Sequence, residues 1–188
     1  MSNAAAVKEE NQLIDSFSYD HIVFRKVKKE DFDRGFLDVF RRLTEVGHVT
    51  REEFEKRYDE LFPKLADYYK IIVAVDTKRD LIVAAGTVFF EKKFIRNTGT
   101  VGHVEDIVSR PDHGSKGLGV KLISVLNALG RHNGAYKVIL DCKESLVPFY
   151  EKNSYKRNEL CMKYSIEEVL QQHKKINEER EKQLKAKL

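Results

Sequence analysis

The chain has 188 residues, of which 41% are hydrophobic and 10% aromatic, a size and composition that suit one domain with one packed core. Its formal net charge of +4 is small beside a charged content of 34%, so composition gives no reason to expect a nucleic-acid-binding protein. Two cysteines are too few for a disulfide framework, and no apolar stretch reaches membrane-spanning length. We therefore expect a cytoplasmic protein that binds neither nucleic acid nor membrane.

The N-terminal part of the chain changes character near residue 17. Residues 1–16 are polar and acidic, and we expect them to be disordered or to include part of a cloning scar. Residues 21–27 alternate as in a strand, and apolar residues at helical spacing follow from 32 to 43. A second helix is predicted after Thr50, because Thr50 and Glu53 form a capping box before an apolar run.

The middle of the chain predicts alternating strands and helices. Strands are expected at 70–75, 81–90 and 100–109, and the first two are joined by a turn-like segment. A glycine-rich segment at 110–119 then opens into an apolar helix that ends at Asn133-Gly134. A short buried strand, a short helix and a last strand are predicted at 137–142, 146–153 and 160–164. The expected fold class is α/β, of the α+β kind.

The C-terminal tail stands apart from this domain, which we place at 17–165. Ser165 and Glu168 form another capping box, and nearly every residue after Asn177 is charged. We expect residues 166–188 to form a solvated helix, and a packing or partner-binding helix is the alternative.

The glycine loop is a candidate anion site. Residues 114–119 offer consecutive backbone N–H groups at the start of a helix, where the helix dipole favours phosphate. Glycine at 117 and 119 lets a pyrophosphate approach the backbone closely, and Lys116 could add charge. On spacing alone, a glycine-rich connection that binds no ligand is equally consistent with the sequence.

Three carboxylates could take part in chemistry. Glu105 and Asp106 are adjacent on a predicted strand, so their side chains should point to opposite faces. Asp141 ends an apolar strand, where an unpaired carboxylate is costly to bury. The structural alternative for each is a carboxylate held at a strand end by backbone donors or a lysine.

Three further residues have simpler interpretations. Tyr150, on the short helix after the 137–142 strand, is expected to be a core residue with a solvated hydroxyl unless it has a catalytic role. His103 is interpreted as a strand residue, and Cys142 as a small residue of the buried core. The histidines show no metal-ligand spacing, so we expect no metal.

Six motifs nevertheless combine into a specific pattern: LTEVG at 43–47, EKKFI at 91–95, GHVEDIV at 102–108, GLG at 117–119, YKVILDC at 136–142 and FYEK at 149–152. In order and spacing they resemble the glucosamine-6-phosphate N-acetyltransferases of the GNAT superfamily, over about two-thirds of the chain. The resemblance implies a mixed central sheet flanked by helices, acetyl-CoA as cosubstrate, and a homodimer with sugar pockets near the subunit interface.

The resemblance also implies a set of site residues. The catalytic residues would be Glu105, Asp141 and Tyr150. Acetyl-CoA would contact Ile107, Val108, Ser109, Gly114, Ser115, Lys116, Gly117, Leu118, Gly119, Val120, Tyr150 and Lys152. The amino-sugar phosphate would contact Thr44, Lys93, Phe94, Ile95, Arg96, Glu105, Asp106, Tyr136, Lys137 and Asp141.

These residues suit acetyl transfer to an amine. An amine attacks a thioester only when neutral, so a carboxylate, or a water held by one, must accept its proton. Backbone N–H groups at 107–109 could stabilise the oxyanion, and Tyr150 could protonate the departing thiolate. The resemblance therefore predicts acetylation of glucosamine 6-phosphate on the route to UDP-N-acetylglucosamine.

Three positions depart from the family pattern. Gly114 stands where a longer side chain usually reaches toward CoA, Arg96 stands where the family usually has histidine, and Ser165 stands where an arginine is expected to bind the sugar phosphate. Arg96 or Arg157 could replace that missing charge. Two alternatives stay open: a relative that acetylates a different amine, and a weakly active relative that binds CoA or a partner.

Overall fold

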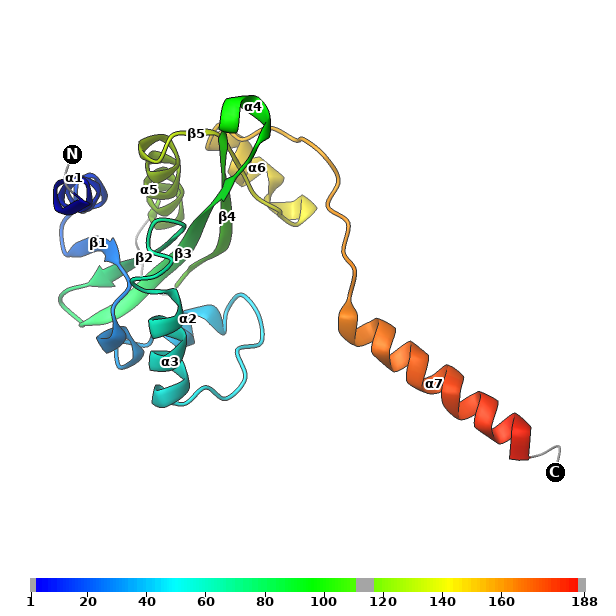
Figure 1. The fold of residues 1–188 in the computed structure, drawn as a ribbon. Coiled ribbons are helices and arrows are strands. Elements are labelled where there is room, and N and C mark those ends of the chain that lie inside the picture. Colours follow the sequence, from blue (N-terminus) through cyan, green and yellow to red (C-terminus); the bar gives the residue numbers. More distant parts are fainter. Residues whose placement is uncertain (1–2, 111–116, 186–188) are drawn as a thin grey trace. The chain divides into compact units, whose positions relative to one another are not determined.

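The computed structural model describes residues 3–110 and 117–185, and the chain forms two units, residues 1–155 and 156–188. The first unit holds a sheet with helices on both faces, and the second holds the helix α7 (Ile166–Lys185) (Figure 1). Within the described ranges, no helix is both long and apolar enough to cross a membrane. Gly114, Ser115 and Lys116, predicted to contact the cosubstrate, lie outside the described residues.

Five strands form one mixed sheet in the order β1-β2-β3-β4-β5. Their bounds are Ile22–Lys26 for β1, Tyr69–Asp76 for β2, Leu81–Lys92 for β3, Thr100–Ser109 for β4 and Ala135–Ile139 for β5. Neighbours from β1 to β4 pair antiparallel, whereas β5 pairs parallel to β4 after the chain crosses over through α5 (Leu118–His132). The predicted α/β class with a mixed central sheet is confirmed.

The β2–β3 hairpin is the centre of the sheet. Its strands are rich in Val and Ile, which favour pleated backbone, and most of their residues are buried because helices cover both faces. Asp76 stabilises the connecting turn by accepting hydrogen bonds from the backbone N–H groups of Lys78 and Arg79, at 2.9 and 3.2 Å.

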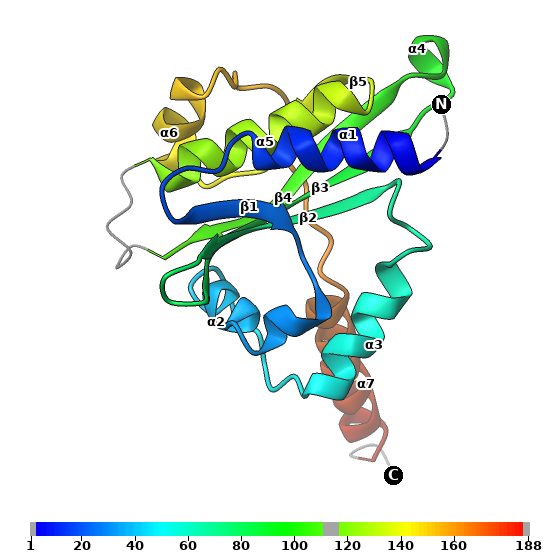
Figure 2. The ribbon, with the colours of Figure 1, turned by 90° about the vertical axis from the view of Figure 1, so that its left-hand side faces the viewer.

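Helices cover the two faces of the sheet in separate layers. Figure 2 shows α5 and α1 (Asn3–Asp15) side by side on one face, with α2 (Phe36–Phe40) and α3 (Arg51–Leu61) on the other. Leu122, Leu126 and Leu129, spaced three and four residues apart on α5, are fully buried against the sheet. Each such leucine stabilises the fold by about 1.5–3 kcal/mol.

The N-terminal segment differs from the expectation of disorder, because residues 3–15 form the helix α1. Glu10 is 4% exposed and forms ion pairs with Lys26 of β1 and with Lys70 of β2, the latter at 3.0 Å. Burial alone would raise the pKa of Glu10, but hydrogen bonds from Lys26 and Lys70 outweigh it, and the net pKa is lowered. The order of this helix therefore depends on lysines far away in the sequence.

We predict that Glu10→Gln lowers the free energy of unfolding by about 3 kcal/mol at pH 7, because it leaves the buried Lys70 without a counter-ion. Urea unfolding followed by circular dichroism measures this, with the exposed Glu9→Gln as the matched control. The pKa of Glu10 is below its ordinary value of 4.5 in the folded protein. The difference between wild type and variant is therefore largest above that pH and shrinks on further acidification. Equal stability of the two variants at pH 7 would contradict the prediction.

The helix predicted at 32–43 is broken into two short pieces, the 3₁₀ helix η1 (Lys29–Phe32) and α2. Gly35 separates them with a φ of +72°, a conformation that favours glycine, and an added Cβ there would lie 3.2 Å from Arg110 Nη2. The fully buried Asp31 pairs with both terminal nitrogens of Arg25, at 2.6 and 2.7 Å. The helix at Thr50 is confirmed as α3, with its capping box.

The C-terminal strands also differ from the predictions. The strand expected at 137–142 begins and ends earlier, as β5, and it is an edge strand rather than a buried one, so Cys142 is exposed instead of lying in the core. Residues 160–164 form no strand, and the first unit ends at Tyr155, ten residues before the predicted domain boundary. Leu160, Met162 and Tyr164 are 92%, 88% and 75% exposed. Alternation alone did not reveal that this segment lacks a pairing partner.

Candidate active site

β4 and β5 remain paired over only part of their length. The ladder runs from Thr100 opposite Ala135 to His103 opposite Ile139, and β4 then continues to Ser109 while β5 ends (Figure 1). Beyond His103, the backbone N–H and C=O groups on the β5 side of β4 have no partner in β5, so they can hydrogen-bond another group. The opening lies beside Ile107, Val108 and Ser109, the segment predicted to stabilise an oxyanion.

A β-bulge lies in β4 at the same level. Ala85 pairs with Val108 and Thr87 pairs with Glu105, so two residues of β4 lie opposite the single Gly86 of β3. Asp106, one of those two, has a φ of +52°, an uncommon conformation for a residue with a side chain. Strained backbone of this kind is typical of functional sites, because the surrounding sheet must hold it in place.

Glu105, Asp106 and Asp141 are brought together at this opening. The pKa of Glu105 is raised, first by burial and then by the negative charges of Asp106 and Asp141, while His103 acts in the opposite direction. Asp141 follows the end of β5, so the loss of strand pairing beyond Ile139 leaves it near Glu105. A carboxylate with a raised pKa accepts a proton more readily and is a candidate general base.

Tyr150 lies on α6 (Val147–Lys152) and is only 8% exposed. Its ring packs edge-on against Phe149 and Tyr155, with centroids 5.1 and 5.9 Å away. The hydroxyl of Tyr155 donates a 2.6 Å hydrogen bond to Asn127 Oδ1 of α5, which joins the segment after α6 to that helix. Burial and the nearby Cys142 raise the pKa of Tyr150, so its hydroxyl remains protonated at neutral pH and can donate a proton.

The start of α5 is the described part of the predicted glycine loop. Gly117 is the N-cap with a φ of +89°, and its carbonyl accepts the backbone N–H of Lys121. The N–H groups of the first helical turn have no acceptor within the helix, so they can bind an anion. Leu118 is buried in the core, so only its backbone can contact a ligand, whereas the side chain of Val120 is exposed.

The connection between β3 and β4 forms an exposed tip that includes α4 (Ile95–Thr98). Arg96 and the next two residues all have positive φ, and the Arg96 guanidinium lies 6.0 Å from the centre of the Tyr136 ring. Gly99 permits this approach, because an added Cβ would lie 2.9 Å from both the Arg96 carbonyl oxygen and the Tyr136 ring. The structure therefore brings Arg96 and Tyr136, two predicted substrate contacts, together.

The other predicted substrate contacts are less closely grouped. Phe94 is 98% exposed, Ile95 is also exposed, and Lys93 pairs with Glu91 at 2.6 Å. Lys137 follows Tyr136 on β5 and is exposed. Thr44 is exposed and belongs to the segment between α2 and α3. That segment runs away from α4 in both views (Figures 1 and 2).

Comparison with known proteins decides the family. The model of the acetyltransferase (GNAT) family matches residues 36–155. The chain belongs to this family. Glucosamine 6-phosphate N-acetyltransferase 1 of Dictyostelium discoideum is 44% identical over 143 residues, which cover 76% of this chain and 90% of that protein. The corresponding protein of Candida albicans is 39% identical over 134 residues, 71% of this chain and 88% of its own length.

A solved structure agrees with the sequence comparisons. The crystal structure of glucosamine-6-phosphate N-acetyltransferase from Arabidopsis thaliana has a TM-score of 0.75 and 35% identity, and the match covers 78% of this chain and 99% of that one. The GNAT fold predicted from the motifs is thereby confirmed. About a fifth of the present chain lies outside the match to the Arabidopsis structure.

Sequence reasoning missed a group of residues next to the carboxylates. It interpreted His103 only as a strand residue, but Nε2 of His103 lies 3.0 Å from Glu91 Oε2. The imidazole ring also stacks on Phe89, with centroids 4.6 Å apart and 10° between the planes. The available signal was the spacing of His103 and Glu105, which places their side chains on the same face of β4.

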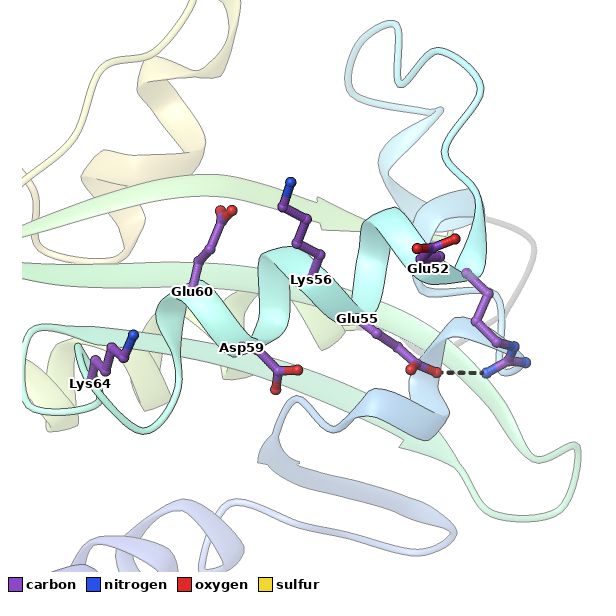
Figure 3. Close-up of a pocket in the computed structure, with 7 residues that line it drawn as sticks. Glu52, Glu55, Lys56, Asp59, Glu60 and Lys64 are labelled. Atoms are coloured by element: carbon purple, nitrogen blue, oxygen red, sulfur yellow. Dashed lines mark ion pairs between the residues drawn. The ribbon is translucent and has the colours of Figure 1, made fainter.

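A hollow along α3 is separate from this chemistry. Seven charged side chains line it, among them Glu52, Glu55 and Lys56, and they point outward from the helix (Figure 3). Arg51 and Glu55 form an ion pair 3.6 Å long across one turn, as on a solvated helix face. The hollow contains none of the predicted site residues, and we assign it no role in the acetyltransferase reaction.

We predict that Tyr150→Phe lowers the maximal rate of acetyl transfer by about 100-fold, because the phenyl ring keeps the aromatic packing but cannot donate a proton. Steady-state kinetics with an amine acceptor measures the rate, and the affinity for CoA should be unchanged. Tyr68→Phe is the matched control, since Tyr68 is an exposed tyrosine outside the site. A maximal rate equal to that of the control would exclude Tyr150 as the proton donor.

Proposed function

We propose that the protein transfers the acetyl group of acetyl-CoA to the amine of glucosamine 6-phosphate. The observation that carries the proposal is the convergence of Glu105, Asp106 and Asp141 where β4 loses its pairing with β5. A base, an open strand edge and a protonated tyrosine are the groups that acetyl transfer to an amine needs. The choice of amine is supported by relatives that are named glucosamine 6-phosphate N-acetyltransferases.

The described residues fit acetyl-CoA. The unpaired edge of β4 at Ile107, Val108 and Ser109 can hydrogen-bond the amides of the pantetheine arm and the thioester oxygen. The first turn of α5, from Gly117 to Val120, can bind the pyrophosphate through backbone N–H groups. We assign Gly114, Ser115 and Lys116 to the same pyrophosphate site, and the exposed Lys152 can add positive charge.

Proton transfer from the amine is assigned to Glu105. The ammonium group must lose a proton before its nitrogen can form the new bond to the thioester carbon, and Glu105 accepts that proton directly or through a water. Asp106 and Asp141 hold the amino sugar and, through their charge, make Glu105 a better base. Once the nitrogen–carbon bond has formed, the carbon–sulfur bond breaks, and Tyr150 donates a proton to the departing thiolate.

The exposed tip supplies the charge for the sugar phosphate. Arg96 and Lys93 on the tip and Lys137 on β5 provide three cations, and Tyr136 lies beside Arg96. Phe94, Ile95 and Thr44 complete the proposed substrate contacts. Arg96 is the candidate to replace the family arginine that is absent at Ser165.

We predict that the purified protein releases CoA thiol from acetyl-CoA when glucosamine 6-phosphate is added, at a rate well above hydrolysis. Thiol release measures the reaction, with glucosamine as the acceptor control because it lacks the phosphate. Binding of CoA without thiol release would exclude glucosamine 6-phosphate as the acceptor. If Ser165→Arg then restores release, the departure at this position is the cause.

We also propose that the protein is a homodimer in the cytoplasm. In the described sheet, β5 has β4 as its one neighbour, so its other edge offers unpaired backbone groups. Leu160, Met162 and Tyr164 alternate along the chain and are exposed, and a second copy could cover them. Cys142 and Cys161 are exposed and form no disulfide, which suits a reducing compartment, and cell fractionation tests this location.

We predict that sedimentation analysis gives twice the chain mass of 21.9 kDa. Met162→Lys should shift the protein toward the monomer, because it places a charge on the surface proposed to be covered. Leu65→Lys is the matched control, since Leu65 is an exposed apolar residue elsewhere in the fold. A wild-type protein that sediments as a monomer would contradict the proposal.

A further inference from the structure

His103 is held in one orientation beside the candidate base. Its Nε2 lies 3.0 Å from Glu91 Oε2, and its ring stacks on Phe89, which in turn stacks on Tyr69 at 5.5 Å. Glu91 is itself fixed by Lys93, whose Nζ lies 2.6 Å from its other carboxylate oxygen. The stacking contact restricts tilting of the imidazole ring, and the hydrogen bond at Nε2 restricts its rotation within the ring plane.

The contact with Glu91 also determines which nitrogen of His103 carries the proton. Hydrogen bonds from Lys93 and then from His103 lower the pKa of Glu91, so this carboxylate remains ionised and can only accept. Nε2 of His103 must therefore be the donor. A second proton can be added only at Nδ1, and the ring then carries a positive charge.

The positions of His103 and Glu105 on β4 bring that charge close to the base. Two residues apart on one strand, they project from the same face about 7 Å apart, before the bulge changes the direction of the strand. Phe89 and Thr87 of β3 lie opposite them. The other charged groups that act on Glu105 are Asp106 and Asp141, and both are negative.

We propose that His103, fixed by Glu91 and Phe89, is a positioning residue whose charge keeps Glu105 ionised and able to accept the proton of the amine. The proposal rests on the proposed function to the extent that Glu105 is the proton acceptor. Burial and two neighbouring carboxylates raise the pKa of Glu105, which makes its ionised form more basic but leaves less of that form as the pH falls. The positive charge of His103 opposes this effect, so the base remains ionised to a lower pH than it would otherwise.

The first experiment measures the carboxyl group itself, independently of activity. The side-chain carboxyl ¹³C signal of Glu105 is titrated in the wild type and in His103→Gln, with Glu105→Gln identifying the signal. We expect the pKa of Glu105 to rise by about half to one pH unit in His103→Gln, as the loss of one charge at this distance requires. An unchanged titration overturns the inference.

The second experiment follows kcat/KM for acetyl transfer against pH in the same proteins. In His103→Gln the acid limb should move to higher pH, with a rate about three- to tenfold lower below the inflection and an unchanged plateau. The KM for acetyl-CoA should also be unchanged, since His103 is not among the residues assigned to acetyl-CoA. A loss of rate that is equal at every pH would indicate a different role for His103 and overturn the inference.

Two further variants distinguish the loss of the His103 charge from a folding defect. Glu91→Gln leaves the histidine in place but removes the negative charge beside it, so it should shift the acid limb in the same direction by less. The exposed His132→Gln, at the end of α5, is the matched control and should shift neither curve. If Glu105 responds to His103→Gln in the titration but no amine is acetylated, the proposed function fails while the coupling between the two residues stands.

Discussion

Backbone hydrogen bonding along β4 is the constraint on which the site depends. A strand inside a sheet normally satisfies its N–H and C=O groups on both sides. Beyond His103, however, β4 loses β5 as a partner, and a bulge shifts its register with β3. The unpaired edge is costly in an isolated fold, and a thioester substrate with amide groups along its arm could satisfy it.

Two glutamates show how the sign of neighbouring charges decides the direction of a pKa shift. Glu10 lies between Lys26 and Lys70, and its pKa is lowered, so it remains an anion that holds α1 on the sheet. Glu105 lies near Asp106 and Asp141, and its pKa is raised, so it can exchange a proton. Burial raises the pKa in both cases, and the opposite net shifts come from the partners that tertiary structure supplies.

Aromatic packing fixes the remaining groups of the site. Tyr150 is held between Phe149 and Tyr155, and His103 is stacked on Phe89, so neither ring can change rotamer freely. At the exposed tip, Gly99 allows the Tyr136 ring and the Arg96 backbone to approach one another. In each case apolar packing or the missing Cβ of Gly99 helps to position the polar group. Such packing uses none of the group's hydrogen-bonding capacity, so the polar group remains able to bind a ligand.

Much of this could be predicted from the sequence, because its signals are local. The bounds of β4, the hairpin of β2 and β3, the cap at Thr50 and the motif order that identifies the family all lie within short segments. The sequence could not show that residues 3–15 are helical, since Glu10 finds its partners 16 and 60 positions away. Nor could it show that β5 is an exposed edge, that Asp141 reaches Glu105, or that His103 contacts Glu91. The sequence by itself determined most of the central strands and helices and the chemical class. Tertiary structure decided the direction of each carboxylate's pKa shift, because pKa values depend on charges brought together by folding.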